Sequence, residues 1–171
     1  MRAFQAAVLA LSRAAAVLSA AILVAMVGHI LVEIALRSFF DSSTFVLDEF
    51  VGYGVAAMTF LTLAYALEDG ALIRVRIVLA RTGGRVRRWL ELFCVAATLG
   101  LSVFLAAYVY RSVARNWQRG AVSQTIAEVP LWIPEGLVLL GLALFSVQLL
   151  AYMVRLLAGA PPIEEHGGRA E

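Results

Sequence analysis

Three residues in the first quarter of the chain have the types and spacing to do chemistry on one face of a helix. His29, Glu33 and Arg37 recur every four residues. Ionisable groups at membrane depth are candidates for function, and these three could form a proton relay or an ion site. Alternatively, Glu33 and Arg37 pair with each other, with His29 hydrogen-bonded nearby. We favour the pair, because Glu33 falls near the end of its apolar run.

The rest of the sequence offers no catalytic or cofactor-binding constellation. The single cysteine, Cys94, lies in an apolar run and excludes both an intrachain disulfide and a cysteine-based metal site. The two histidines, His29 and His166, lie in different regions, which argues against a haem held between helices. No phosphate-binding glycine loop is present. We therefore predict a protein that is not an enzyme and that binds no cofactor or metal.

Composition places the chain in a membrane. Hydrophobic residues make up 62% of its 171 residues, and the mean hydropathy is +0.87, more than a soluble domain can bury. Four long runs lack charged residues, and each is about as long as a bilayer core is thick. Continuous runs of this kind span a membrane as helices. We predict an all-α integral membrane protein of one domain, 1–171, with spans at about 14–36, 49–68, 90–112 and 135–156.

The two ends of the chain are predicted to lie outside the spans. Residues 3–12 are expected to form a short interfacial helix, which Arg13 separates from the first span. The apolar run after Arg13 is too long for a signal peptide. Residues 157–171 are expected to form a flexible cytoplasmic tail.

The basic residues indicate the orientation, and all fourteen are arginine. Four spans put the N-terminus, the middle loop and the C-terminus on one side, and most arginines fall there. Positive residues favour the cytoplasm, so both termini are predicted to be cytoplasmic. The net charge of +2 is small and does not suggest nucleic acid. The arginines on the opposite side are Arg37, Arg111, Arg115 and Arg119.

The middle loop, 68–91, alternates apolar residues with arginines. This pattern is typical of an amphipathic segment on the membrane surface, where guanidinium groups reach phospholipid phosphates. An ordinary positively charged cytoplasmic loop is equally compatible with it. The candidate residues for contact with lipid are Arg74, Arg76, Arg81, Arg85, Arg88 and Trp89.

The third loop ends in the stretch "PLWIPE", residues 130–135. Pro130 and Pro134 fix their own φ and favour extended geometry in the residues before them. We predict a stiff, extended piece with Trp132 anchored at the membrane interface. Glu135 is then expected in the first turn of the fourth span, near the positive end of the helix dipole.

These features together resemble the small membrane subunit of tripartite ATP-independent periplasmic (TRAP) transporters, over roughly residues 15–155. Three stretches carry the resemblance: Arg37 with "LDEFVGY" at 47–53, "GALIRVRI" at 70–77, and "PLWIPE" at 130–135, the most specific of them. The middle stretch departs from the family pattern, with Leu72 for the usual histidine and Arg76 for the usual acid. The added charge of Arg76 favours lipid contact.

The resemblance implies a function as well as a fold. It implies a bacterial inner-membrane scaffold subunit in a sodium-driven importer of organic-acid-type solutes. A large elevator subunit would carry the solute, and a periplasmic solute-binding protein would deliver it. The candidate residues for contact with these partners are Arg37, Asp48, Glu49, Pro130, Trp132, Pro134 and Glu135.

Two other functions remain open on the sequence alone. A self-sufficient, proton-coupled four-span transporter also has a glutamate in its first span, but there the acid sits at mid-membrane. A membrane enzyme subunit that holds haem or quinone is disfavoured by the histidine count.

Overall fold

Four long helices make up most of the chain. The computed structural model describes residues 2–70 and 84–158. Its helices are α1 (Arg2–Phe40), α2 (Leu47–Glu68), α4 (Gly84–Arg119) and α5 (Trp132–Leu157). All four are long and apolar enough to cross a membrane. Extended pairing within the described ranges is limited to one isolated bridge, between Val122 and Pro130. The predicted fold class, all-α with four membrane helices, is confirmed.

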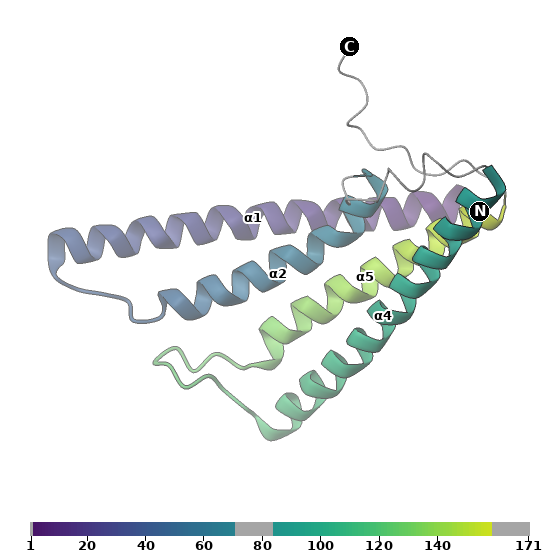
Figure 1. Ribbon diagram of the computed structural model, residues 1–171. Helices are drawn as coiled ribbons and strands as arrows, with labels where there is room; N and C mark the ends of the chain where they lie inside the picture. The colour runs from purple at the N-terminus through teal and green to yellow at the C-terminus, as the bar shows by residue number, and fades with distance from the viewer. Residues whose placement is uncertain (1, 71–83, 159–171) are drawn as a thin grey trace, which may run out of the picture.

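The helices form a fan with α5 near its centre. α5 packs against α4 on one side and α2 on the other, and α2 packs in turn against α1. Figure 1 shows the helices converging where α1 begins and α5 ends, and spreading toward the loops at 41–46 and 120–131. The apolar stretch of α5 is 50% buried, against 11% for those of α1 and α4. The outer helices therefore leave most of their apolar surface outside the bundle.

Hydrogen bonds between helices join each neighbouring pair in the fan. Ser19 of α1 lies 2.7 Å from Thr62 of α2, between their hydroxyl oxygens, and Ser102 of α4 lies 2.9 Å from Ser146 of α5. Lipid gives no hydrophobic drive for helix association, so such bonds and close packing have to hold a membrane bundle together. Each bond contributes about 0.6 kcal/mol on average.

α2 and α5 approach most closely at Gly141. A Cβ at Gly141 would lie 2.5 Å from the backbone carbonyl carbon of Phe60 and 2.8 Å from the nitrogen of Leu61. No side chain fits there without moving the backbone of α2. Below this crossing, toward the converging end, the core is made of Leu67, Val95, Phe145, Leu149, Tyr152 and Leu156.

The N-terminal residues do not form a separate interfacial helix. They are helical, but α1 runs without a break from Arg2 to Phe40. Val8 and Ser12 are 8% and 1% exposed, and the Ser12 hydroxyl donates to Gln148 Oε1 of α5 at 3.4 Å. Because these residues pack against the bundle, the helix has no reason to bend onto the membrane surface at Arg13.

Candidate functional site

Polar side chains gather at two levels of the bundle. The outer level, at the end with loops 41–46 and 120–131, contains Glu33, Glu49 and Glu135. The inner level, at the converging end, contains Ser12 and Glu68. At 1.5 Å per residue, the rise from Ser12 to Glu33 is about 31 Å and that from Glu49 to Glu68 about 28 Å. Both values match a hydrocarbon core of about 30 Å, so these groups sit at the boundaries of the apolar layer.

Glu33 is the most fully enclosed acid of the outer level. It is 1% exposed. Its Oε1 accepts hydrogen bonds from Arg37 Nε at 2.8 Å and from the Ser43 hydroxyl. Its Oε2 accepts from the Thr44 backbone N–H at 2.9 Å and from the Thr44 hydroxyl at 2.6 Å. The predicted pairing of Glu33 with Arg37 is confirmed, and the loop after α1 supplies the other donors.

These hydrogen bonds hold loop 41–46 in a conformation that is unfavourable for two of its residues. Asp41 has φ 46° and Phe45 has φ 57°, both in the left-handed region that bulky side chains avoid. The backbone N–H of Phe45 donates to the Ser43 hydroxyl at 3.1 Å, and Ser43 donates to Glu33. Glu33 therefore anchors the loop.

Within residues 2–70 and 84–158, no three histidine, cysteine or acidic side chains lie together as metal ligands would.

His29 lies one turn nearer the middle of α1 than Glu33. Its Nε2 is 3.5 Å from the Thr44 hydroxyl, and its ring lies 5.8 Å from the ring of Phe50 on α2. His29 reaches Glu33 only through Thr44, so the three predicted residues form a short chain of contacts that ends at Arg37. That arrangement fixes the end of α1 against the loop and the start of α2.

Glu49 connects the start of α2 to the third loop. It accepts hydrogen bonds from the Tyr53 hydroxyl at 2.7 Å and from the Thr125 hydroxyl. Thr125 lies 3.1 Å from Ser123, measured between their hydroxyl oxygens. Asp48, next to Glu49 in the first turn of α2, is exposed. Of the predicted acid pair, Glu49 is thus hydrogen-bonded within the chain, whereas Asp48 is exposed.

The third loop begins with a glycine cap. Gly120 has φ 58°, and its N–H donates to the Trp117 carbonyl at 3.3 Å. The N–H of Ala121 donates to the Asn116 carbonyl at 3.0 Å, which completes a Schellman motif. The helix therefore ends after Arg119, as the glycine predicts. Arg111, Arg115 and Arg119 are exposed along this last part of α4.

The extended piece predicted for "VPLWIP", residues 129–134, is correct only in its first part. Val129 and Pro130 lie against residues 121–123, with the Leu131 N–H donating to the Ala121 carbonyl at 3.0 Å. However, α5 already begins at Trp132, so Ile133 is helical. Pro134 is tolerated because the N–H groups of a first helical turn have no partner within the helix.

Two contacts fix the start of α5 against the end of α4. The rings of Trp117 and Trp132 lie 4.6 Å apart in an edge-to-face arrangement with an interplanar angle of 75°. Glu135, in the first turn of α5 as predicted, accepts from Asn116 Nδ2 at 2.9 Å and from the Ser112 hydroxyl at 3.1 Å. Trp132, Pro134 and Glu135 thus pack within the chain. Pro134 is buried, and Trp132 is partly exposed.

The inner level contains a network that the sequence reading missed. Glu68 accepts from Gln148 Nε2 at 2.6 Å and from Arg155 at 2.9 Å. Tyr152 donates to Glu91 at 2.7 Å. The signal was available, because Gln148 is a rare polar residue in the middle of an apolar run and Glu68 ends another. Pairing them required knowing that α2 and α5 are neighbours.

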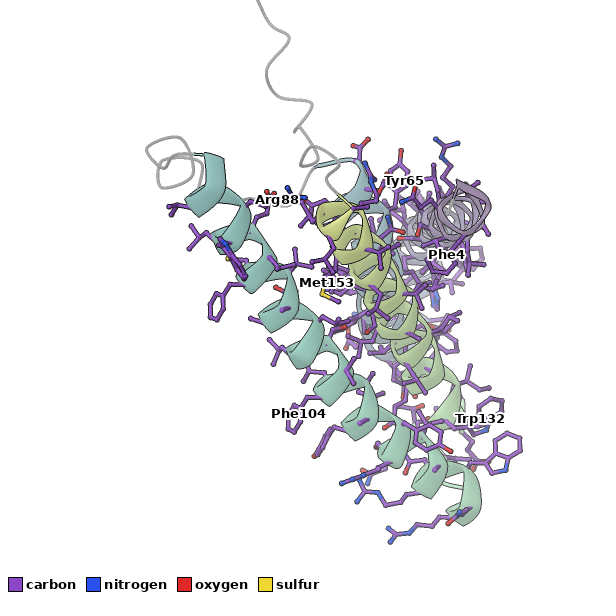
Figure 2. All side chains as sticks on the ribbon, turned by 90° about the vertical axis from the view of Figure 1, so that its right-hand side faces the viewer. Phe4, Tyr65, Arg88, Phe104, Trp132 and Met153 are labelled. Atoms are coloured by element: carbon purple, nitrogen blue, oxygen red, sulfur yellow. The ribbon has the colours of Figure 1, made fainter. Side chains whose placement is uncertain are left out.

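The arginines predicted to contact lipid belong mostly to the middle loop. Arg74, Arg76 and Arg81 lie outside the described residues, as does the side chain of Arg85. Arg88 donates to the carbonyl of Leu156, and Figure 2 shows it reaching from α4 toward the end of α5. Trp89 is 74% exposed. The predicted tail also lies outside the described residues, from 159 onward.

A comparison with protein families decides between the readings left open by the sequence. The family model "Tripartite ATP-independent periplasmic transporters, DctQ component" matches residues 26–159, well over half of the chain. The chain belongs to this family. No curated protein and no solved structure matches it.

Membership of the DctQ family has three consequences. The protein is a multi-pass membrane component of a transporter, as the four helices also indicate. Its family is not an enzyme family. The alternative of a self-sufficient proton-coupled transporter gains no support from the match.

Proposed function

We propose that this DctQ-family protein is the scaffold subunit of a sodium-driven TRAP transporter that imports an organic-acid-type solute. A large elevator subunit would carry the solute and sodium sites, and a periplasmic binding protein would deliver the solute. The bacterial inner membrane would hold the complex, with both termini of this chain in the cytoplasm.

The proposal is supported mainly by the glutamates at the two polar levels of the bundle, which are hydrogen-bonded to residues of the same chain. Glu33, Glu49 and Glu135 at the outer level all accept hydrogen bonds from residues of the same chain. Glu68 at the inner level does so as well. An acid that moves protons or ions has to exchange partners, whereas these acids fasten loops and helices together. This arrangement suits a static component.

The apolar exterior supports a partner role. Phe104 on α4 points away from the other helices, as Figure 2 shows, and is 67% exposed. A thin fan with so much surface outside its own packing suits a subunit that is completed by another membrane protein. We propose that the partner-facing outer residues include Arg37, Asp48 and Trp132, which retain exposed surface.

Co-purification tests this proposal. The tagged chain is co-expressed with the large membrane subunit from the same genome and extracted in mild detergent. We expect a stable complex of both subunits that survives gel filtration. The control is an unrelated four-span membrane protein carrying the same tag. Separate elution of the two subunits at all detergent concentrations would contradict the scaffold role.

A further inference from the structure

An apolar groove runs between α1 and α5 at the outer half of the bundle. The cavity has a volume of about 300 Å³. Met26 and His29 of α1 line one wall, Ile133 and Leu137 line the other, and Gly54 and Ala57 of α2 form part of its floor. α1 and α5 meet at the inner level, where Ser12 contacts Gln148, and part toward the outer level. The groove is the space that this divergence opens over α2.

The depth of the groove places it in the outer half of the apolar layer. At 1.5 Å per residue, His29 lies about 6 Å inside the level of Glu33, and Ile22, which also lines the groove, about 16 Å inside it. Phe50 and Ile133 at its edges are 41% and 43% exposed, so the groove opens sideways to whatever surrounds the bundle. Water finds few polar partners there, and an empty groove would forfeit van der Waals contacts along both walls.

The lining of the groove restricts the chemistry of its occupant. All of its lining residues except His29 and Tyr53 have apolar side chains or are glycine. A thin, flexible hydrocarbon chain can enter it from the open side, past Phe50 and Ile133. Over Gly54 the floor is covered by the Met26 side chain, which a Cβ at Gly54 would overlap.

We propose that this groove is a binding site for one acyl chain of an outer-leaflet glycerophospholipid. The polar groups above it fit the other end of such a molecule. The Arg37 side chain is 64% exposed at the outer level, beside the Glu33 carboxylate that holds it. Its Nη2 also donates to the Ser43 hydroxyl at 3.3 Å. The rest of this exposed guanidinium group is placed to meet a phosphate while the acyl chain lies below, along Met26 and Leu137. The acyl chain fills the groove and thereby keeps α1 at a fixed angle to α5.

Photo-crosslinking tests this site on the full chain, alone and in complex with the large subunit. The protein is reconstituted into vesicles of phosphatidylethanolamine and phosphatidylglycerol with a small fraction of phosphatidylethanolamine bearing a diazirine on its acyl chain. Mass spectrometry then maps the labelled peptides. We expect labelling at Ile22 and Met26, which line the groove, to exceed, several-fold, labelling at Phe104. Phe104 lies at a similar depth on the exposed face of α4.

Two variants sharpen the test. Ala25→Trp places a large ring in the groove and should reduce labelling at Ile22 and Met26 several-fold, with Ala25→Phe as a milder form. Ala20→Trp is the matched control, since Ala20 is exposed on α1 but points about 140° away from Ala25. It should leave labelling unchanged.

Three results would overturn the proposal. They are equal labelling of the groove and Phe104, labelling that Ala25→Trp leaves intact in a folded protein, and cross-linking of the groove to a large-subunit peptide in place of lipid. The comparison with Phe104 uses the unchanged chain, so it decides the question even if both groove variants misfold.

Discussion

At the scale of single residues, the glutamates of the outer level accept hydrogen bonds from donors in their own chain. Glu33 is the clearest case, with donors from Arg37, Ser43 and Thr44. Arg37 is only one of these, and its side chain is 64% exposed. Exposed ion pairs contribute little to stability, whereas enclosed hydrogen-bond donors that lose their acceptor are penalised in full. The loop donors therefore matter more than the ion pair.

Substitutions at Glu33 and Arg37 should separate these two contributions. Glu33→Ala is expected to lower the thermal unfolding temperature of the detergent-solubilised chain clearly more than Arg37→Ala does. It should also speed proteolysis within loop 41–46, because Ser43 and Thr44 lose their acceptor. Asp48→Ala is the control, since Asp48 is an exposed acid at the same end. Equal shifts for Glu33→Ala and Arg37→Ala would show that the loop bonds contribute nothing.

Trp132 is expected to act on both folding and assembly. Its edge-to-face contact with Trp117 should contribute about 0.5–1.5 kcal/mol to stability, measurable in a double-mutant cycle with Trp117→Ala and Trp132→Ala.

The remaining exposed surface of Trp132 predicts an effect on assembly. Trp132→Ala should lower the yield of the complex with the large subunit without changing the solute that is transported. Trp89→Ala, at the opposite end of the bundle, is the control for loss of a tryptophan. An unchanged complex yield together with an altered solute profile would contradict this expectation.

At the scale of helices, the sequence predicts existence and order better than it predicts ends and contacts. Charge-free runs predicted all four membrane helices, because the length of such a run is set by bilayer thickness. The prolines predict extended geometry up to Pro134, but α5 begins at Trp132, because a proline is compatible with the first turn of a helix. The separate helix at residues 3–12 was wrong, because packing of Ser12 against Gln148 keeps α1 straight.

Contacts between helices are harder to predict from the sequence than the helices themselves. A Cβ at Gly52 or Gly100 would have nothing within 4 Å, whereas a Cβ at Gly141 would overlap the backbone of Phe60. Small residues are common in membrane helices, so spacing alone does not tell which of them faces a neighbour.

Gly141→Ala tests the helix crossing. The added methyl group would overlap the backbone of Phe60, so we expect a loss of about 1–3 kcal/mol in unfolding free energy. Gly136→Ala, on the same helix with open space around it, should be neutral or slightly stabilising, because alanine is the better helix former. Unfolding in mixed detergents measures both. Similar values for the two variants would show that α2 and α5 are not in contact at Gly141.

At the scale of the whole molecule, the arginines and the four spans predict that both termini are cytoplasmic. In a Cys94→Ser background, Ser42→Cys and Gln124→Cys place single thiols in the two outer loops. We expect a membrane-impermeant maleimide added from the periplasm to label both. Ala158→Cys, at the end of α5, should react only after the membrane is permeabilised. Labelling of Ala158→Cys in intact cells stripped of the outer membrane would reverse the orientation.

The arrangement of the four helices also explains why this one chain indicates the transporter family but not the solute. Glu33, Glu49, Glu68 and Glu135 are hydrogen-bonded within the chain, and the outer helices leave apolar surface exposed. Both observations fit our proposal that the partner subunits recognise the solute. The family that the stretches at 47–53 and 130–135 indicate is confirmed, since its family model matches residues 26–159. In the structure these two stretches lie at the starts of α2 and α5, where Glu49 and Glu135 accept hydrogen bonds. The groove between α1 and α5 has no signature in the sequence, since it arises from the angle between helices that are far apart along the chain.

Reconstituted uptake tests the central claim most directly. Vesicles contain the large subunit with or without this chain, and the purified binding protein is added outside with the organic acid that it carries, as identified by mass spectrometry. With an inward sodium gradient, we expect uptake only when both membrane subunits are present, and none from this chain alone. Full uptake without this chain, or uptake by this chain without the large subunit, would contradict its role as a scaffold subunit.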